Sequence, residues 1–189
     1  MNYSADELKA LGLGSFGENV RIHKSAVLIN PAGLQFGNNV RVDCFCVFSA
    51  GPAGIRVGDY VHVAAGCYLF GGGGPIVLED FSGLSSRVSI YTATDDYTEG
   101  YLTNPTVPDE FKKVTGGAVF LRKHVIIGAG SVILPGVELG IGSAVGALTC
   151  VRKDVEPFKV VVGNPARAVG ERGRKLLELE QELRKRQPG

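Results

Sequence analysis

An uninterrupted six-residue repeat runs from Leu121 to Glu156 and constrains the fold more than any other feature of the chain. This stretch divides into LRKHVI, IGAGSV, ILPGVE, LGIGSA, VGALTC and VRKDVE, and each hexad opens on an aliphatic residue. The third and fifth places are mostly small or β-branched, as in Ala129, Ser131, Ala147 and Thr149. A period of six is neither helical nor a simple strand alternation. The chain is therefore predicted to repeat one small structural unit.

The same hexads fill most of the chain before residue 121. Three hexads make one unit, and units start at residues 16, 36, 57, 78, 121 and 139. Slips of two or three residues separate the early units. The middle hexads all open on aliphatic residues, which are Ile22, Val42, Val63, Leu84, Ile127 and Val145. Their third places are mostly small, and they are Lys24, Cys44, Ala65, Ser86, Ala129 and Ala147.

A triangular solenoid explains this pattern. Each hexad supplies one flat face and a turn, three faces close one coil, and coils stack at about the 4.8 Å spacing of neighbouring strands. The opening aliphatic residue points inward and builds a continuous core. Corners need small residues or residues that tolerate a left-handed backbone, which accounts for Gly37-Asn38-Asn39 and Gly58-Asp59. Six coils predict a prism on the order of 30 Å tall.

Composition agrees with this fold and excludes several functional classes. The 189 residues include 27 Gly and no Trp, as expected for short strands joined by tight turns. The net charge of +1 argues against a nucleic-acid surface, and no apolar run is long enough to span a membrane. The segment MNYSADELKALGLG contains acidic residues and lacks a signal-peptide core, so we expect a cytoplasmic protein.

The four cysteines are predicted to be small core residues. Cys44 and Cys46 are separated by one residue, which is too close for a two-residue CxxC metal knuckle. Cytosolic thiols stay reduced, and free Cys is usually buried. No metal site is predicted. A nucleophilic Cys is the alternative.

Three segments depart from the repeat. Residues 1–15 are predicted to form a helical cap, with a capping box at Ser4 and Glu7. Residues 96–117 interrupt the domain at 16–170 and contain two Pro and three aromatic residues, which favours an ordered protruding loop. A strand is predicted at 159–162. A charged C-terminal helix is predicted within 171–189, over 173–187, with an apolar side for packing.

The repeats of the form [LIV]-G-x-x-[SAV]-x, followed by VRKDVEPFKVVVGNPAR, resemble the hexapeptide-repeat acyltransferases. The resemblance covers about residues 16–170 and is greatest to the sugar acetyltransferase branch, which includes enzymes that modify sugars for surface polysaccharides. It implies a left-handed parallel β-helix, whereas general crossover rules predict the opposite hand. It also implies acetyl-CoA as co-substrate and a homotrimer with active sites between neighbouring prisms.

The resemblance also implies positions that contact CoA. Ala129 and Ala147 match places where pantetheine approaches the backbone along stacked coils. Arg152, Lys153 and Arg167 match positions near the CoA phosphates, where cationic side chains form charge-assisted bonds. The alternatives are ordinary corner packing for the alanines and a solvated surface for the three cations.

The chain departs from the pattern at the catalytic position. Similar sugar acetyltransferases carry a His before the long loop, in a context like [ST]-H-D. Here Asp95 stands in that place and is followed by Asp96. The histidines lie elsewhere, at positions 23, 62 and 124, each at an outward place in its hexad. His124 lies in the coil next to the loop and is the reserve candidate for a general base.

This departure favours an amine as the acceptor. A sugar hydroxyl normally needs a base with a pKa near neutral, which His supplies, whereas an ordinary Asp has a pKa of about 4. An amine needs less help, and a carboxylate would hold it in place. We therefore predict N-acylation of a nucleotide-linked amino sugar, with the small-molecule acceptor set by Asp95, Asp96 and the loop. Alternatively, the two acids only cap a turn.

Two other functions remain open at the level of sequence, and a third is disfavoured. A burial-raised Asp pKa would permit O-acetylation of a sugar hydroxyl. Loss of the His would also suit a non-catalytic scaffold or sugar-binding protein. The γ-type carbonic anhydrases share the solenoid, but they need two nearby histidines plus a third, and this chain has no such pair.

Overall fold

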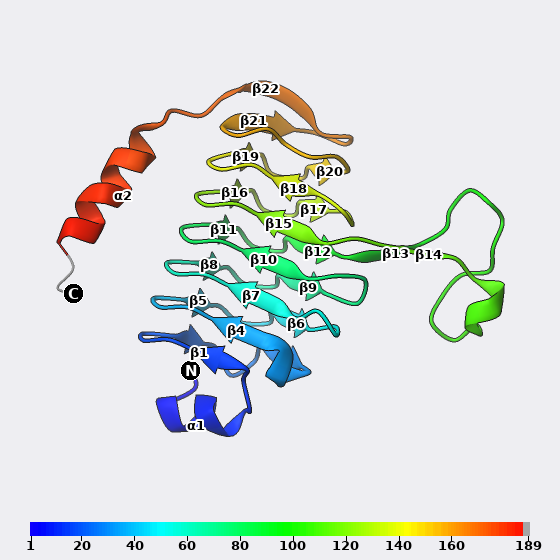
Figure 1. Cartoon of the computed structure of the whole chain (residues 1–189), viewed down its shortest axis with the longest axis horizontal. Coiled ribbons are helices and arrows are strands. Elements are labelled where there is room, and N and C mark those ends of the chain that lie inside the picture. Colours follow the sequence, from blue (N-terminus) through cyan, green and yellow to red (C-terminus); the bar gives the residue numbers. More distant parts are fainter. Residues whose placement is uncertain (187–189) are drawn as a thin grey trace.

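The computed structural model describes residues 1–186, which form a three-sided solenoid of parallel strands (Figure 1). The first sheet contains, in spatial order, β1 (Ser15–Phe16), β4 (Leu34–Phe36), β7 (Ile55–Val57), β10 (Ile76–Leu78), β15 (Val119–Leu121) and β18 (Glu138–Leu139). The second sheet contains β2 (Arg21–Ile22), β5 (Arg41–Val42), β8 (His62–Val63), β11 (Gly83–Leu84), β16 (Ile126–Ile127), β19 (Ala144–Val145), β21 (Lys159–Val162) and β22 (Arg167–Glu171). The third sheet contains β3 (Val27–Ile29), β6 (Val47–Ser49), β9 (Tyr68–Phe70), β12 (Ser89–Tyr91), β17 (Val132–Ile133) and β20 (Cys150–Val151).

The hexad prediction is confirmed strand by strand. The aliphatic openers of the middle hexads are in register along the second sheet, as shown by the pairs Leu84↔Val63 and Ile127↔Val145. Each of these openers is at most 3% exposed. Because each coil places its inward residue above that of the coil below, the core is one continuous apolar column.

Close stacking at the corners requires glycine at particular places. A Cβ atom on Gly51 would lie 2.0 Å from the carbonyl oxygen of Gly71, one coil away. A Cβ on Gly128 would lie 2.4 Å from the backbone nitrogen of Ala147. The slips in the repeat fall between the third and first sheets, where the short 3-10 helix η1 (Pro31–Gly33) occupies one corner. Extra residues there leave the strand registers intact.

Both ends of the solenoid are covered. The helix α1 (Ala5–Ala10) begins after Ser4, whose capping box with Glu7 is present as predicted, and it buries Leu8 against the core. At the other end a partial seventh coil follows the six predicted coils, because Val155 bridges Leu139 and β21 pairs with β19. The strand predicted at 159–162 is confirmed as β21. The antiparallel strand β22 then closes the second sheet.

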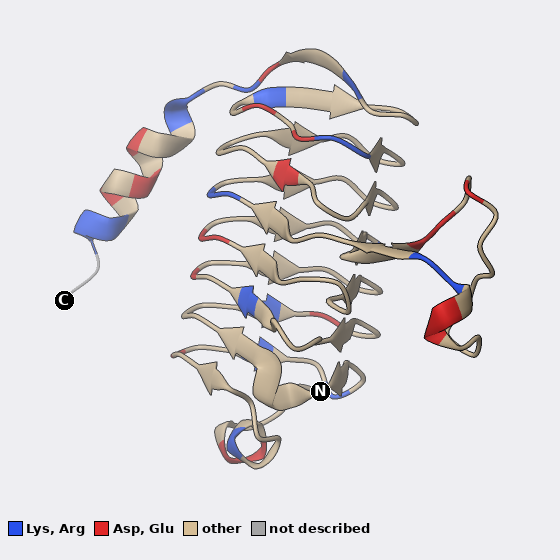
Figure 2. Ribbon diagram, turned by 45° about the vertical axis from the view of Figure 1, so that its right-hand side comes forward, with Lys and Arg blue, Asp and Glu red and all other residues tan. Residues whose placement is uncertain are grey.

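The long interruption is an arm that projects from the prism (Figures 1 and 2). It begins with the antiparallel pair β13 (Ala93–Asp95) and β14 (Val114–Gly116) and includes the 3-10 helix η2 (Asp109–Phe111). The arm therefore starts at Ala93, three residues before the predicted loop at 96–117, and its base is a two-stranded stalk. The arm leaves the corner between the third and first sheets.

The helix α2 (Lys175–Lys185) lies on the opposite side of the prism from the arm in both ribbon views. It lies against the corner between the first and second sheets, where Tyr60, Phe81 and His124 stack with ring centroids 4.8 and 5.1 Å apart. Leu179 and Leu183 of its predicted apolar side stay exposed. Residues 187–189 of the predicted C-terminal segment lie outside the described residues. No helix within residues 1–186 is long and apolar enough to cross a membrane.

Charged contacts through Glu180 hold α2 in place. Its carboxylate lies 2.6 Å from His124 Nε2 and accepts hydrogen bonds from Lys123 Nζ at 3.2 Å and Arg184 Nε at 2.7 Å. Burial raises the pKa of Glu180, but the hydrogen bonds from Arg184, His124 and Lys123 outweigh it. The pKa consequently falls from the ordinary 4.5 to about 2. The ionised carboxylate therefore stabilises the docked helix.

Replacing Glu180 by Gln should lower the free energy of unfolding at pH 7 by about 2 kcal/mol, the usual range for hydrogen bonds to a charged group. Because the folded-state pKa is depressed, this contribution is complete above about pH 4.5 and is lost as the pH falls towards about 2. Urea unfolding measured across that range checks both the size and the pH dependence. Glu178→Gln, on the exposed side of the same helix, is the matched control. Equal unfolding of Glu180→Gln and wild type at pH 7 would contradict this role.

Candidate functional site

Ala129 and Ala147 stack at the corner between the second and third sheets. The backbone N–H of Leu148 donates to the carbonyl oxygen of Ala129 at 2.9 Å, so the two alanines lie on successive coils. Ala147 is exposed and Ala129 is half-buried. With only methyl groups projecting, an extended ligand could approach the backbone here. The structure thus places both predicted residues in one continuous column.

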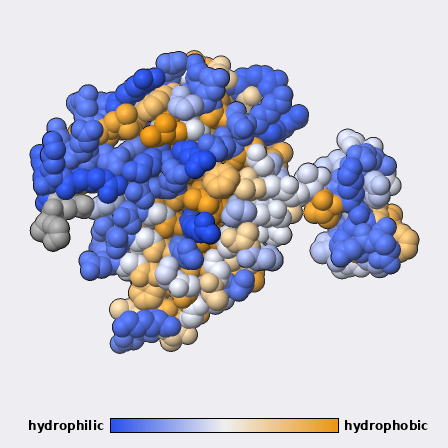
Figure 3. Space-filling model, viewed as in Figure 1, coloured by the Kyte–Doolittle hydropathy of each residue, from blue (hydrophilic) through white to orange (hydrophobic). Residues whose placement is uncertain are grey.

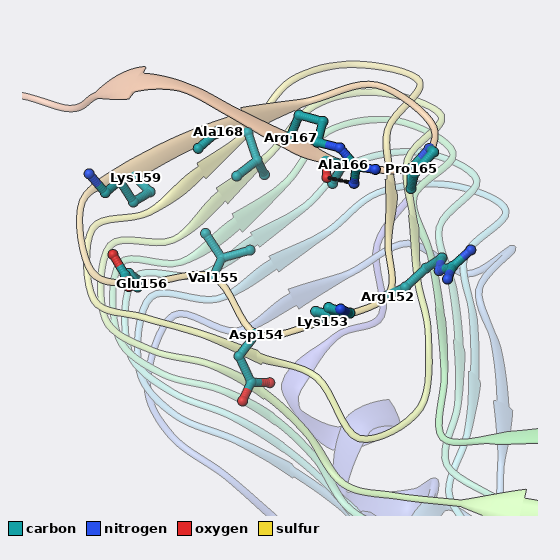
Figure 4. A pocket seen from close by; sticks show the side chains of 11 residues that line it. Arg152, Lys153, Asp154, Val155, Glu156, Lys159, Pro165, Ala166, Arg167 and Ala168 are labelled. Atoms are coloured by element: carbon teal, nitrogen blue, oxygen red, sulfur yellow. Dashed lines mark hydrogen bonds between the residues drawn. The ribbon is translucent and has the colours of Figure 1, made fainter.

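Arg152, Lys153 and Arg167 line one hollow of about 450 Å³ at the C-terminal end of the prism (Figure 4). Figure 4 shows Arg167 and Lys153 across the hollow from each other, while the Arg152 side chain points away from it. Arg167 Nη1 donates to the carbonyl oxygen of Ala166 at 3.0 Å. Within residues 1–186, the side chains of Arg152 and Lys153 have neither a hydrogen bond nor an ion pair, which leaves their charges available to an anion.

The turn after β21 connects the alanine column with this hollow. The N–H of Cys150 donates to the carbonyl oxygen of Gly163 at 3.0 Å, and the N–H of Ala166 donates to that of Cys150 at 2.9 Å. Arg167 therefore follows directly above the column. A long ligand with a slender stem and terminal phosphates would fit this order of features.

Asp95 lies at the base of the arm and lines a second hollow of about 520 Å³. The other lining residues are Tyr91, Ala93, Thr94, Tyr97, Val114 and Leu134. Asp95 Oδ2 accepts the backbone N–H of Asn104 at 3.2 Å. Among the described residues Oδ1 has no partner. A half-buried carboxylate with one free oxygen can accept a hydrogen bond from a cationic or polar ligand.

Asp96 has a structural task within the arm. Its carboxylate accepts the backbone N–H of Glu99 at 2.7 Å and both the N–H and the hydroxyl of Thr98, at 3.3 and 3.2 Å. Partial burial raises the pKa of Asp96, but these hydrogen bonds from Glu99 and Thr98 outweigh it and the pKa is lowered. The turn-capping alternative considered for the two acids thus describes Asp96, and Asp95 is the carboxylate that faces the hollow.

His124 occupies a different corner from Asp95. It was expected at an outward place near the arm, but its side chain is only 7% exposed and lies beneath α2, paired with Glu180. The partner comes from 56 residues further along the chain, so the hexad position alone did not reveal it. Within one chain His124 is paired with Glu180 of α2, and α2 lies on the side of the prism opposite the arm (Figure 1). The structure does not bring it together with Asp95.

The other titratable groups do not form a metal centre in residues 1–186, where no cluster of three or more His, Cys, Asp or Glu side chains could hold an ion. His62 Nε2 lies 2.8 Å from Asp43 Oδ2 on the second sheet, whereas His23 is near the N-terminus. Cys46 and Cys67 are buried, as predicted for core residues, whereas Cys44 and Cys150 are half-buried.

Sequence reasoning missed the wall of the Asp95 hollow. Tyr91 and Leu134 both follow the opener of a third-sheet hexad and therefore point outward on neighbouring coils. The aligned column of second residues contains this signal, since it is mostly apolar or aromatic and reads Ile29, Ser49, Phe70, Tyr91, Leu134 and Arg152. Tyr97 had no such signal, because the repeat is lost in the arm.

Comparisons with known proteins agree with this architecture. The chain is 48% identical over 174 residues to dTDP-4-amino-4,6-dideoxy-D-glucose acyltransferase of Escherichia coli, covering 92% of this chain and 90% of that protein. It superposes with a TM-score of 0.95 on a serine-to-cysteine variant of AntD, an N-acyltransferase from Bacillus cereus, in complex with dTDP-4-amino-4,6-dideoxyglucose and coenzyme A. There the identity is 44%, with 98% of each chain covered.

A maltose O-acetyltransferase from Clostridium difficile 630 shares the fold, with a TM-score of 0.58 at 22% identity, covering 89% of this chain and 74% of that one. No protein-family model matches the chain. The similarity to the Escherichia coli enzyme and to AntD extends over almost the whole length of the chain. The repeat, the solenoid and these two relatives together show that the chain belongs to the hexapeptide-repeat acyltransferases of the left-handed β-helix fold, in the branch of sugar N-acyltransferases.

Proposed function

We propose that this enzyme transfers an acyl group from a CoA thioester to the amine of dTDP-4-amino-4,6-dideoxyglucose or a closely similar nucleotide-linked amino sugar. The similarity to the Escherichia coli acyltransferase, 48% identity over 92% of this chain, carries the proposal. The carboxylate at Asp95, in the place where similar O-acetyltransferases have a His, supports an amine acceptor. The acylated product would be a nucleotide-activated sugar, suited to transfer into a surface polysaccharide.

The chemistry needs a neutral amine beside the thioester carbonyl. The amine nitrogen attacks that carbon, the C–N bond forms, and collapse of the tetrahedral intermediate breaks the C–S bond. The CoA thiolate leaves and takes up the proton that the nitrogen loses. Asp95 Oδ1 would accept a hydrogen bond from the amine and hold it in line for attack. No covalent enzyme intermediate is required.

The alanine column suits the acyl donor, and so does the end hollow, where four cationic residues outnumber the two acids Asp154 and Glu156. Pantetheine would lie against Ala129 and Ala147, and the CoA phosphates would meet Lys153 and Arg167 beyond the turn at 163–166. Arg152 would contribute from the edge of the hollow. We propose acetyl-CoA as donor. AntD has also been solved with 3-hydroxybutyryl-CoA, so a longer acyl group is the alternative to test.

An apolar third sheet supports a homotrimer. Its strands, all within the described part of the chain, contain no Lys, Arg, Asp or Glu (Figure 2). On its outer face Val27 and Ile29 are each 50% exposed, and Tyr68 is 40% exposed. The arm adds hydrophobic residues at a distance from the prism (Figure 3). Apolar surface of this extent is typical of an interface, and a cyclic trimer would let each arm reach the next prism.

Thiol release from acetyl-CoA, measured over a panel of acceptors, tests the proposed function. We expect turnover with dTDP-4-amino-4,6-dideoxyglucose and none with the analogue that carries a hydroxyl in place of the amine. Asp95→Asn should lower kcat/KM for the amine about 10- to 100-fold, because a charge-assisted hydrogen bond contributes about 1.5–3 kcal/mol. Asp96→Asn, on the structural side of the same turn, is the control and should retain most activity.

Equal turnover of the hydroxyl analogue would instead establish an O-acyltransferase. Absence of both turnover and acetyl-CoA binding would favour the non-catalytic scaffold. Loss of turnover in a folded His124→Ala variant would assign the role of general base to His124. An acetylated cysteine trapped during turnover would contradict direct attack by the amine.

Removing the cations of the end hollow should weaken CoA without affecting the acceptor. We expect Lys153→Ala and Arg167→Ala each to raise the dissociation constant for CoA about two- to fivefold, as is usual for exposed charge pairs, and the effect should shrink at high salt. Calorimetric titration with CoA measures this change. Arg56→Ala, an exposed arginine on the first sheet, is the control. Unchanged CoA affinity in a variant that combines Lys153→Ala with Arg167→Ala would show that these residues do not belong to the cofactor site.

A further inference from the structure

Phe45, Gly66 and Arg87 form a second column at the corner between the second and third sheets, below the alanine column. The N–H of Gly66 donates to the carbonyl oxygen of Cys44 at 2.9 Å, and the N–H of Arg87 donates to that of Ala65 at 3.0 Å. The three residues therefore occupy the same place on successive coils. Phe45 and Arg87 are two coils apart, which corresponds to about 10 Å.

The side chains of Phe45 and Arg87 are free within the described chain. The Phe45 ring is 69% exposed and has no aromatic partner in residues 1–186. Arg87 is exposed, and its guanidinium has no hydrogen bond or ion pair with any described residue. The nearby carboxylate of Asp43 is already held by Arg41 and His62, at 2.7 and 2.8 Å. Arg87 thus presents an uncompensated positive charge at the same corner as the exposed Phe45 ring, two coils away.

The backbone makes these two residues costly to keep. Phe45 and Arg87 have φ angles of 59° and 60°, in the left-handed region that disfavours residues with a Cβ, whereas Gly66 and Gly130 fill the same place on other coils. Tyr60, Phe81 and His124 are also left-handed, but they stack with one another beneath α2. No aromatic stack of this kind offsets the strain at Phe45 and Arg87, nor at Leu148, which has a φ of 55° at the same place and is 78% exposed. Strained residues with exposed side chains point to a position used for a ligand.

A nucleoside diphosphate fits the order of these three residues. A base can stack on the Phe45 ring, as bases do on exposed aromatic side chains. Gly66 has no side chain, which leaves room for the stem of Arg87 to lie over it, since a Cβ on Gly66 would be 3.4 Å from Arg87 Cγ. The guanidinium of Arg87 can bind the diphosphate through paired hydrogen bonds. Beside this column the second sheet has a hollow of about 330 Å³, lined in part by His62, Ala64, Ser85 and Ser86.

The two columns also meet in the right order for the reaction. Arg87 lies one coil below Ala129, because the N–H of Gly130 donates to the carbonyl oxygen of Ser86 at 3.0 Å. The arm leaves the prism directly after β12, in the same coil as Arg87. A sugar attached to a diphosphate at Arg87 would therefore stand level with the arm and next to the thioester end of the alanine column.

We infer that Phe45, Gly66 and Arg87 bind the nucleoside diphosphate of the acceptor, with the base on Phe45 and the diphosphate on Arg87. This inference rests on the proposed function, because it takes the acceptor to be nucleotide-linked. The competing source of the same chemistry is the adenosine diphosphate part of CoA. Direct binding measurements with the two ligands distinguish the two sources.

Calorimetric titration of the full chain with dTDP, thymidine and CoA tests the inference. Phe45→Ala should raise the dissociation constants for dTDP and thymidine about 5- to 100-fold, the range for loss of one stacked base. Arg87→Ala should weaken dTDP at least tenfold but leave thymidine unchanged, and Arg87→Lys should restore part of the affinity because only the paired geometry is lost. Arg56→Ala, which removes an exposed arginine on another face, should bind dTDP like wild type. The affinity for CoA should stay constant in all variants.

Wild-type dTDP affinity in both Phe45→Ala and Arg87→Ala would overturn the inference and leave the proposed function intact. A loss of CoA affinity instead of dTDP affinity would assign the column to the cofactor. A change in oligomeric state of Phe45→Ala, measured by light scattering, with unchanged dTDP affinity would assign Phe45 to a subunit contact. If wild type neither binds dTDP nor turns over the nucleotide sugar, the proposed function itself fails.

Discussion

Stacking of the inward aliphatic residues, coil upon coil, is the interaction on which the rest of the structure depends. The openers of the hexads form one buried column in each sheet, and their burial provides the main driving force for the fold. Because the strand registers are fixed by this core, each outward residue also lies above its counterpart one coil below. Outward side chains that act on one ligand can therefore form columns on the surface of the prism. The alanine column and the Phe45–Arg87 column are two such arrangements at one corner.

The regular part of the molecule was predictable because its energetics are local and repeated. Ile127 and Val145 could be placed in the core from the period alone, and the capping box at Ser4 identified α1. Contacts outside the repeat were not predictable in the same way. His124 has an outward position in its hexad, yet α2 buries it through Glu180, which is remote in sequence. The β13–β14 stalk was missed because two-residue alternation is too short there to give a signal.

The candidate site was predictable in part for the same reason. The alanines and the cations of the end hollow follow from motif positions in the regular coils, and the structure places them in one connected region. Asp95 could be predicted because it lies where the repeat breaks. The different roles of Asp95 and Asp96 could not be predicted, because they depend on the turn at Thr98 and Glu99. Phe45 and Arg87 belong to no motif, and only their exposed side chains and left-handed backbone angles in the structure distinguish them.

The two halves of the proposed site lie at opposite edges of the third sheet. Asp95 lies at the arm, on the corner with the first sheet, whereas the Phe45–Arg87 column and the alanine column lie on the corner with the second sheet. One chain cannot bring the two edges together across its own sheet. A cyclic trimer with a shared apolar face would place the arm of one chain against the column corner of the next. The proposed reaction therefore requires active sites shared between chains.

Activity of mixed trimers tests this requirement most directly. Chains with Asp95→Asn and chains with Arg87→Ala, each of low activity alone, would be coexpressed in equal amounts and assayed for thiol release with the amino sugar. If each site takes Asp95 from one chain and Arg87 from its neighbour, roughly a quarter of the sites are intact in a cyclic assembly, and activity should recover to about that fraction of wild type. Activity no higher than that of the separate variants would contradict a shared site.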